Sequence, residues 1–299
     1  MNKHMSERFT KHIVHFPAIL AVVIPLLTIS TLAQSQGQYT PPPPPPPPTA
    51  SETTQPAPPP PAALSLRELD GIVGRVALYP DPLLAHVLTT TTYWDDVPEA
   101  ARWADEHSYL KGRALADAIR EDNLTWSPDI LALLPFPSIL DMMAHDPDWT
   151  RRLGEAVLAQ RAEVMDAVQR MRKQARKYGY LDTTAYDNVI DAAGYIEILP
   201  VNPDYIYVPI YDPGIVFFAP RPGFVIAGAI RFGPAVIVGP VFAAWGWVHP
   251  YFEWGSHAIF FDRVPWSRTW INRGYYIHPF AYPWVRSGPR VERHELRHR

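Results

Sequence analysis

The end of the chain contains the clearest catalytic pattern in the sequence. His294, Glu295 and His298 have the spacing H-E-x-x-H. On a helix this spacing places two imidazoles on one face to hold Zn²⁺, with the glutamate positioned to activate a bound water. The residues around them are mainly Arg, His and Glu, which leaves little apolar surface to pack such a helix. The composition favours a disordered basic tail over residues 286–299, and a zinc-dependent hydrolase is the alternative.

A second group of metal-ligating residue types lies further from the end. His249, Glu253 and His257 follow one another at intervals of four residues, and histidine and carboxylate are common zinc ligands. Pro250 and Gly255 interrupt the helix that this spacing requires, so packing is favoured over a metal site here. The sequence has no P-loop, nucleophile elbow or dinucleotide fingerprint, and no cofactor is predicted.

Aromatic residues are concentrated in the Gly-punctuated region 223–285. Exposed aromatic clusters mark surfaces that bind a protein, a glycan or the membrane interface. The alternative is that these side chains close a core, and the sequence supports both interpretations equally. The candidate binding residues are Trp245, Trp247, Trp254, Trp266 and Trp270.

Charge and cysteine content exclude several classes of protein. Without residues 1–33 the chain has 24 basic and 29 acidic residues, a net charge of −5. This sign argues against general nucleic-acid binding, which needs a basic surface. The chain has no cysteine, so disulfides, a thiol nucleophile, a cysteine zinc site and a lipid-modified N-terminal cysteine are all excluded.

The N-terminal segment predicts export. A basic head precedes an apolar run from Ile13 to Leu32 that ends in small residues, which is typical of a signal peptide covering residues 1–33 and cleaved after Ala33. An uncleaved membrane anchor is the alternative, because the run is close to spanning length. We expect a periplasmic or secreted protein. Residues 34–63 contain 13 of the 35 prolines and predict a disordered linker with a stiff polyproline spacer, or else a docking ligand.

Residues 64–180 predict a compact helical domain. Ser65 and Glu68 form a capping box, and Gly71 and Gly74 in the same helix predict close packing by a neighbouring element. Other helix starts are expected at Asp81-Pro82, Asp96, Ser127-Pro128 and Pro137-Ser138, where we interpret both aspartates as N-caps. The longest predicted helix covers Arg161 to Tyr178 and ends at Gly179.

Beyond the helices the hydrophobic period changes from about 3.6 residues to two. Short strands are expected at Ile196–Ile198, Tyr205–Tyr211 and Ile215–Phe218, separated by Asn-Pro-Asp and Asp-Pro-Gly turn signals. We therefore predict an α+β fold, in which the helical domain is followed by a small antiparallel β meander over residues 181–222.

Several ordered motifs resemble one bacterial family. The resemblance covers roughly residues 66–220 and identifies the chain as similar to the exported family called domain of unknown function 3300. It implies a secreted or envelope-facing protein, and it implies no activity. The motifs are those at 78–88, 99–103, Trp149, 164–172, 196–200, Asn202-Pro203 and 207–213.

These observations together favour an exported protein of the cell envelope that acts as a non-catalytic binding or structural module. An envelope protein, a glycan or the membrane interface are the expected classes of partner. A zinc-dependent hydrolase and a membrane-associated envelope protein are the alternatives.

Overall fold

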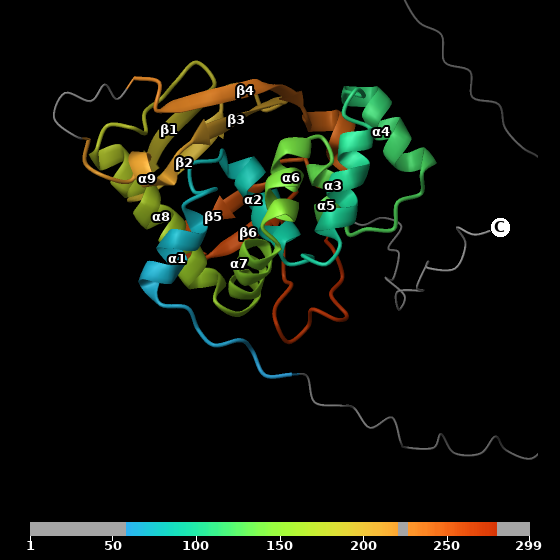
Figure 1. Cartoon of the computed structure of the whole chain (residues 1–299), viewed down its shortest axis with the longest axis horizontal. Coiled ribbons are helices and arrows are strands. Elements are labelled where there is room, and N and C mark those ends of the chain that lie inside the picture. The colour runs from blue at the N-terminus through green and yellow to red at the C-terminus, as the bar shows by residue number, and fades with distance from the viewer. Residues whose placement is uncertain (1–57, 221–226, 280–299) are drawn as a thin grey trace, which may run out of the picture. The chain divides into compact units, whose positions relative to one another are not determined.

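Eight helices make up the first part of the chain that the computed structural model describes, namely residues 58–220 and 227–279. Their bounds are α1 Leu66–Val73, α2 Asp81–Thr91, α3 Val97–Glu106, α4 Gly112–Glu121, α5 Pro128–Leu133, α6 Pro137–His145, α7 Pro147–Ala159 and α8 Arg161–Lys177. Helix α7 packs against both α2 and α8, and α3 packs against α6 (Figure 1).

Local capping chemistry explains where several of these helices begin and end. The Ser65–Glu68 capping box is present at α1, and Ser127 caps α5 by accepting a hydrogen bond from the backbone N–H of Asp129. Gly179 has a positive φ of 78° just after α8, a conformation that glycine adopts without strain. The predicted starts of these helices are confirmed.

The two aspartates interpreted as N-caps behave differently. Asp81 is the first residue of α2 rather than its N-cap, and its side chain bonds elsewhere. Asp96 does occupy the N-cap position of α3, but its side chain makes no capping hydrogen bond. The sequence therefore located both helix starts correctly and placed Asp96 at the N-cap, while the N-cap position predicted for Asp81 is wrong.

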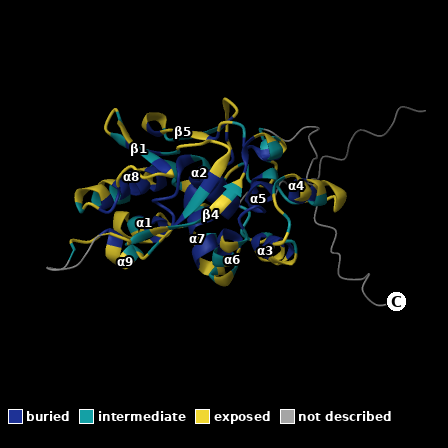
Figure 2. Cartoon of the chain, turned by 90° about the horizontal axis from the view of Figure 1, so that it is seen from above, coloured by how far each residue is buried: buried dark blue, intermediate teal, exposed yellow. Residues whose placement is uncertain are grey.

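Helix α2 lies at the centre of the core. All of its residues except Pro82 are buried, and Figure 2 shows the helix in the colour of buried positions. Helix α7 approaches α2 so closely that a Cβ added at Gly154 would lie 2.0 Å from the carbonyl oxygen of Thr91. Only glycine fits this crossing, because real Cβ contacts are not that short.

Two antiparallel pairs of strands follow the helices, and both pairs are called hairpins below, although only the first has a tight turn. Strands β1 (Asp187–Ala192) and β2 (Tyr195–Pro200) pair across a tight turn, in which Ala193 and Gly194 both have positive φ. Strand β3 (Tyr205–Tyr211) pairs with β4 (Ile230–Ile237), with a register shift between Tyr207 and Pro209.

The strand pairing corrects two details of the predicted meander. Strand β3 takes its hydrogen bonds from β4, more than eighteen residues later, and not from β2. The strand expected at Ile215–Phe218 does not form, and its first residues lie in the short helix α9 (Pro213–Val216). This helix begins there because the Asp212 side chain caps it by accepting a hydrogen bond from the backbone N–H of Gly214. The fold class itself is confirmed: a helical segment followed by small antiparallel sheets.

The final described segment returns to the helices. It consists of the 3-10 helix η1 (Gly239–Trp245), strand β5 (Tyr251–Glu253), the 3-10 turn η2 (Trp254–Ser256), strand β6 (Ala258–Phe261) and strand β7 (Val264–Pro265). Its three strands form an antiparallel sheet in the order β5-β6-β7. Buried residues of the helices, the hairpins and this segment belong to one hydrophobic core. Within the described residues, no helix has both the length and the apolar character needed to span a bilayer.

Candidate functional site

The candidate binding tryptophans lie mainly inside the protein. Trp245, Trp247, Trp254 and Trp266 are buried, and Trp270 is partly buried. The prediction that they form an exposed binding surface is therefore wrong for the first four, and the alternative that they close the core describes them correctly.

Three of these indole rings also bond to the helical segment. Trp247 donates its Nε1–H to the carbonyl of Ala132, 2.9 Å away. Trp254 and Trp266 donate to carboxylate oxygens of Asp81 and Asp129, each at 3.3 Å. A buried tryptophan needs such a partner for its N–H, so the aromatic segment is fixed to the helices by polar contacts as well as by packing.

The predicted metal candidates are not brought together as a ligand set. His249 and His257 occupy turns with positive φ, Glu253 ends β5 and accepts a hydrogen bond from Ser256, and His257 bonds to Asp166 at 2.9 Å. Among the described residues no three His, Cys, Asp or Glu side chains are grouped to hold a metal ion. The helix that the four-residue spacing required does not form there. His294, Glu295 and His298 lie outside the described residues, as do residues 1–57.

The first of two buried ionic networks centres on Asp81 and Arg172. Their side chains are 3% and 0% exposed, and Nη1 of the guanidinium lies 2.6 Å from Oδ1 of the carboxylate. Arg172 also donates to the carbonyls of Ala77, Tyr79 and Ile196 at 2.8–3.0 Å. Burial raises the pKa of Asp81, and the charge of Arg172 opposes that shift.

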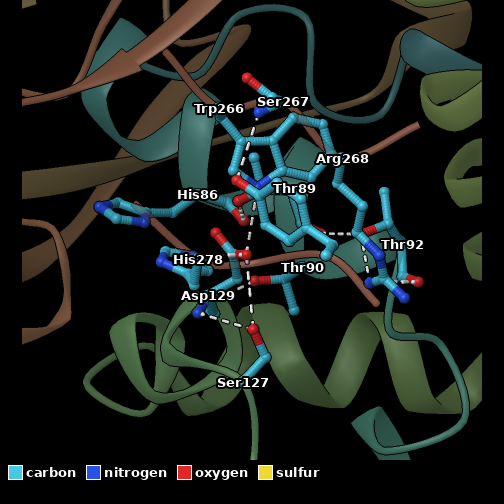
Figure 3. Close-up of polar contacts among 11 residues, drawn as sticks. His86, Thr89, Thr90, Thr92, Ser127, Asp129, Trp266, Ser267, Arg268 and His278 are labelled. Atoms are coloured by element: carbon cyan, nitrogen blue, oxygen red, sulfur yellow. Dashed lines mark hydrogen bonds and ion pairs between the residues drawn. The ribbon is translucent and has the colours of Figure 1, made fainter. Parts of the chain in front are cut away.

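The second network surrounds Asp129, the second residue of α5 (Figure 3). Its Oδ2 lies 2.7 Å from Nε2 of His278 and also accepts from the indole of Trp266. Thr90 of α2 donates to its backbone carbonyl at 2.7 Å. Burial alone would raise the pKa of Asp129, but the charge and hydrogen bond of His278 outweigh it, and the pKa lies below its ordinary value.

Two further buried side chains lie close to this second network (Figure 3). Arg268 donates to both the carbonyl and the hydroxyl of Thr92 at the end of α2, each at 3.0 Å, and its guanidinium carbon lies 3.6 Å from the ring centre of Tyr93. His86 is fully buried between the rings of Trp247 and Phe261. Burial lowers the pKa of His86 to about 3, so this ring is neutral near pH 7.

Both networks join segments that are far apart in the sequence, and both lie below the surface. The first connects α8, α2 and β2, while the second connects the residues after β7 to α2 and α5. Their carboxylates are 0–3% exposed, so a substrate has no access to them in this arrangement. Their role is structural, since they hold distant segments of the chain together.

A third buried carboxylate has different surroundings. Asp187, the first residue of β1, is 3% exposed, and its side chain has no hydrogen bond or ion pair with any described residue. It lines a cavity of about 200 Å³ at the two hairpins, together with apolar residues that include Leu78, Ile198 and Phe232. Burial raises the pKa of Asp187 to about 7.

No sequence signal points to this residue, because an aspartate at the start of a short strand is ordinary. The same is true of Asp129, whose Ser-Pro-Asp context predicts only a helix start.

Exposed apolar side chains are also distributed unevenly. Residues 64–180 expose two large hydrophobic side chains, Leu66 and Tyr109. The much shorter hairpin region, defined here as residues 186–220 and 227–237, exposes eight: Tyr186, Ile190, Val201, Tyr205, Ile210, Ile215, Phe218 and Ile237. A high density of such side chains is typical of surfaces that bind a partner.

The fold and these sites define a class of α+β domain in which a helical segment, two hairpins and an aromatic segment share one core held by buried ionic networks. The chain belongs to the family described as "Protein of unknown function (DUF3300)", whose model matches residues 65–275. The resemblance drawn from the sequence motifs is thereby confirmed.

One relative is the uncharacterized protein YacH of Escherichia coli (strain K12), which is 31% identical over 188 residues. The match covers 52% of this chain and 30% of that protein, so it spans less than a third of the relative's length. No solved structure is significantly similar to this chain.

Proposed function

We propose that this protein is exported to the cell envelope and acts there as a non-catalytic binding module, with another envelope protein as its partner. The observation that carries the proposal is the contrast in exposed apolar surface between the hairpin region and the helical segment. Interfaces are enriched in aromatic residues relative to the remaining surface, and three of the eight exposed side chains in the hairpin region are aromatic.

Two features of the hairpin region support a protein partner. Each hairpin contains only two strands, so within the described residues β1 and β4 each have an edge without a paired strand. An extended segment of another protein can add to such an edge through main-chain hydrogen bonds. Tyr205 and Ile237 are neighbours in the β3–β4 register and are both exposed, which places apolar side chains beside the free edge of β4.

Export is supported by the sequence of residues 1–33 and by the proline-rich segment that follows. The test is cell fractionation of the full-length protein, followed by N-terminal sequencing of the purified product. We expect an envelope fraction and a mature chain that begins at Gln34. A stable native protein in the cytosol that retains residues 1–33 would refute the location.

Binding is tested by photo-crosslinking in intact cells, with a photoreactive amino acid placed at single exposed positions. Tyr205 and Ile210 report on the hairpin region, and Leu66 and Tyr109 are matched controls, since they are exposed and apolar but belong to the helical segment. We expect a discrete protein adduct from the first pair only, identified by mass spectrometry as an envelope protein.

Three results would contradict this function. Equal crosslinking from all four positions would show that the hairpin region is not special. Adducts with lipid or glycan alone would replace the protein partner with another class. Stoichiometric zinc in the purified protein that disappears when residues 290–299 are deleted would favour a zinc-dependent hydrolase.

A further inference from the structure

The cavity beside Asp187 is a partly open, mainly apolar hollow at the junction of the two hairpins and the helical segment. Its volume of about 200 Å³ exceeds the roughly 150 Å³ that holds one benzene molecule in an engineered protein cavity. One six-membered ring with a short substituent therefore fits. The apolar residues of its wall include Leu78, Leu181, Val189, Ile198, Pro209, Ile230 and Phe232.

The Asp187 carboxyl is held in place in this cavity without a polar partner. Its backbone is fixed by Thr184, whose hydroxyl accepts from the Asp187 N–H at 3.1 Å and whose N–H donates to the Asp187 carbonyl at 2.9 Å. The carboxyl oxygen Oδ1 is fully buried and makes no hydrogen bond. A buried polar atom without a partner costs free energy, and such atoms are a small minority in native structures, so each one calls for an explanation.

The ionisable residues around the cavity indicate the charge of the ligand that it would bind. Its ionisable lining residues are Asp187, Asp182 and Tyr180, and no Lys, Arg or His contributes to the lining. Asp182 is exposed at the rim, where it accepts from the backbone N–H of Thr183. Two carboxyl groups and no cationic side chain favour a positively charged ligand, and the apolar wall favours one with a hydrocarbon body.

We propose that this cavity binds a small organic ammonium ion, which donates a hydrogen bond to the Asp187 carboxylate and packs its apolar body against Ile198, Ile230 and Phe232. The proposal does not depend on the protein partner proposed above, since it rests on the cavity and not on the exposed face. A cation beside the carboxylate favours its charged form, so the bound ligand removes the cost of burying Asp187.

The experiment uses the intact protein, isotope-labelled for NMR and titrated at pH 8. Benzylammonium is the probe, and benzyl alcohol is its neutral counterpart of nearly equal size. We expect saturable shifts of the Ile198 and Ile230 methyl signals with benzylammonium. The affinity for benzyl alcohol should be lower by about tenfold or more, because a hydrogen bond to a charged group contributes about 1.5–3 kcal/mol.

Two variants identify the carboxylate responsible. Asp187→Asn keeps the size of the side chain and removes its charge, so we expect it to weaken benzylammonium binding by about tenfold or more and leave benzyl alcohol binding unchanged. Asp182→Asn is the matched control at the exposed rim, where we expect a change below about threefold because solvent screens the charge. Circular dichroism establishes that both variants are folded.

Acid conditions provide a further readout. Below pH 7 the ligand must displace a proton from Asp187, whose pKa burial has raised to about 7. Affinity should then fall by up to about tenfold for each pH unit, and Asp187→Asn should abolish that dependence.

The proposal is overturned if the protein binds neither probe at millimolar concentration, if it binds both probes equally, or if Asp187→Asn binds benzylammonium as well as the wild type. Binding of Ca²⁺ or Mg²⁺ that Asp187→Asn abolishes, without benzylammonium binding, would overturn it too. None of these results alters the crosslinking pattern expected for the hairpin region, so the two proposals fail independently.

Discussion

The buried carboxylates in the core beneath the helices are paired, whereas the buried carboxylate in the cavity between the hairpins is not paired with any residue that the structure describes. Asp81 and Asp129 each have a cationic or imidazole partner within 2.7 Å and an indole N–H donor. Asp187 is as buried as they are, yet it has no such partner among the described residues. Charges paired in a core stabilise one arrangement of the chain, whereas an unpaired carboxyl beside an empty space is available to a ligand.

The largest expected effect breaks the first of the core networks. Arg172→Met leaves the Asp81 carboxylate buried without its cation, and we expect a loss of about 3–5 kcal/mol in the free energy of unfolding. Arg170→Met is the matched control two residues away, since Arg170 pairs with Asp70 near the surface at 36% and 33% side-chain exposure. It should cost less than about 1 kcal/mol.

Denaturant unfolding of both variants measures this difference. Similar losses for the two arginines would mean that the buried pair has no special role. Replacing Asp81 and Arg172 together by apolar residues should recover part of the loss, because the uncompensated charge is then removed as well.

The next prediction concerns the cavity residue Asp187, whose substitution is expected to raise the free energy of unfolding instead of lowering it. The pKa of Asp187 is raised from 3.8 to about 7 in the folded protein, so its contribution to stability is complete below the unfolded-state pKa and is lost as pH rises through 7. Asp187→Asn should therefore be more stable than the wild type at pH 8, by about 2–4 kcal/mol, and nearly equal to it at pH 4.

Thermal unfolding of the two proteins between pH 4 and pH 8 tests this sign. A variant that is destabilised at pH 8 would show that the carboxylate makes a favourable contact in the folded state, and the contrast with Asp81 and Asp129 would then be lost.

Local signals allowed most of the fold to be predicted. The starts of α1 and α5 follow from Ser65 with Glu68 and from Ser127 with a proline behind it, because a cap needs only residues within one turn. The pairing of β3 with β4 could not be read in this way. A long connection separates the two strands, and no turn motif links them.

The sites depend on contacts over longer separations, and the sequence did not indicate them. Arg172 meets Asp81 across 91 positions of the chain, and His278 meets Asp129 across 149. A lone aspartate before a strand or near a helix start has an ordinary local explanation. Its role can be recognised only in the folded structure, which shows whether a partner side chain or a cavity lies next to it.

Packing space distinguishes two glycines within the helical segment, Gly71 in α1 and Gly154 in α7. The sequence predicts close packing at Gly71 and Gly74. A Cβ at Gly74 would lie 3.6 Å from the ring of Phe217, whereas one at Gly71 meets nothing within 4 Å and one at Gly154 overlaps the backbone of Thr91. Gly154→Ala should destabilise the protein by about 1–3 kcal/mol through overpacking. Gly71→Ala, the matched control in α1, should stabilise it by about 0.5–1 kcal/mol. Equal effects in denaturant unfolding would contradict the close crossing of α2 and α7.

The smallest expected effect compares two tryptophans of the aromatic segment. Trp266 donates to the buried carboxylate of Asp129, whereas Trp270 donates to the backbone carbonyl of Pro58 near the surface, at 3.0 Å. Trp266→Phe should cost about 1–2 kcal/mol, since it removes a hydrogen bond to a buried charged group. Trp270→Phe should cost less than about 0.5 kcal/mol, because water replaces the lost contact. Denaturant unfolding at pH 7 measures both changes. If Trp270→Phe costs as much as Trp266→Phe, the segment after β7 is held by its surface contacts and not by the Asp129 network, and the fixing role assigned to that carboxylate is wrong.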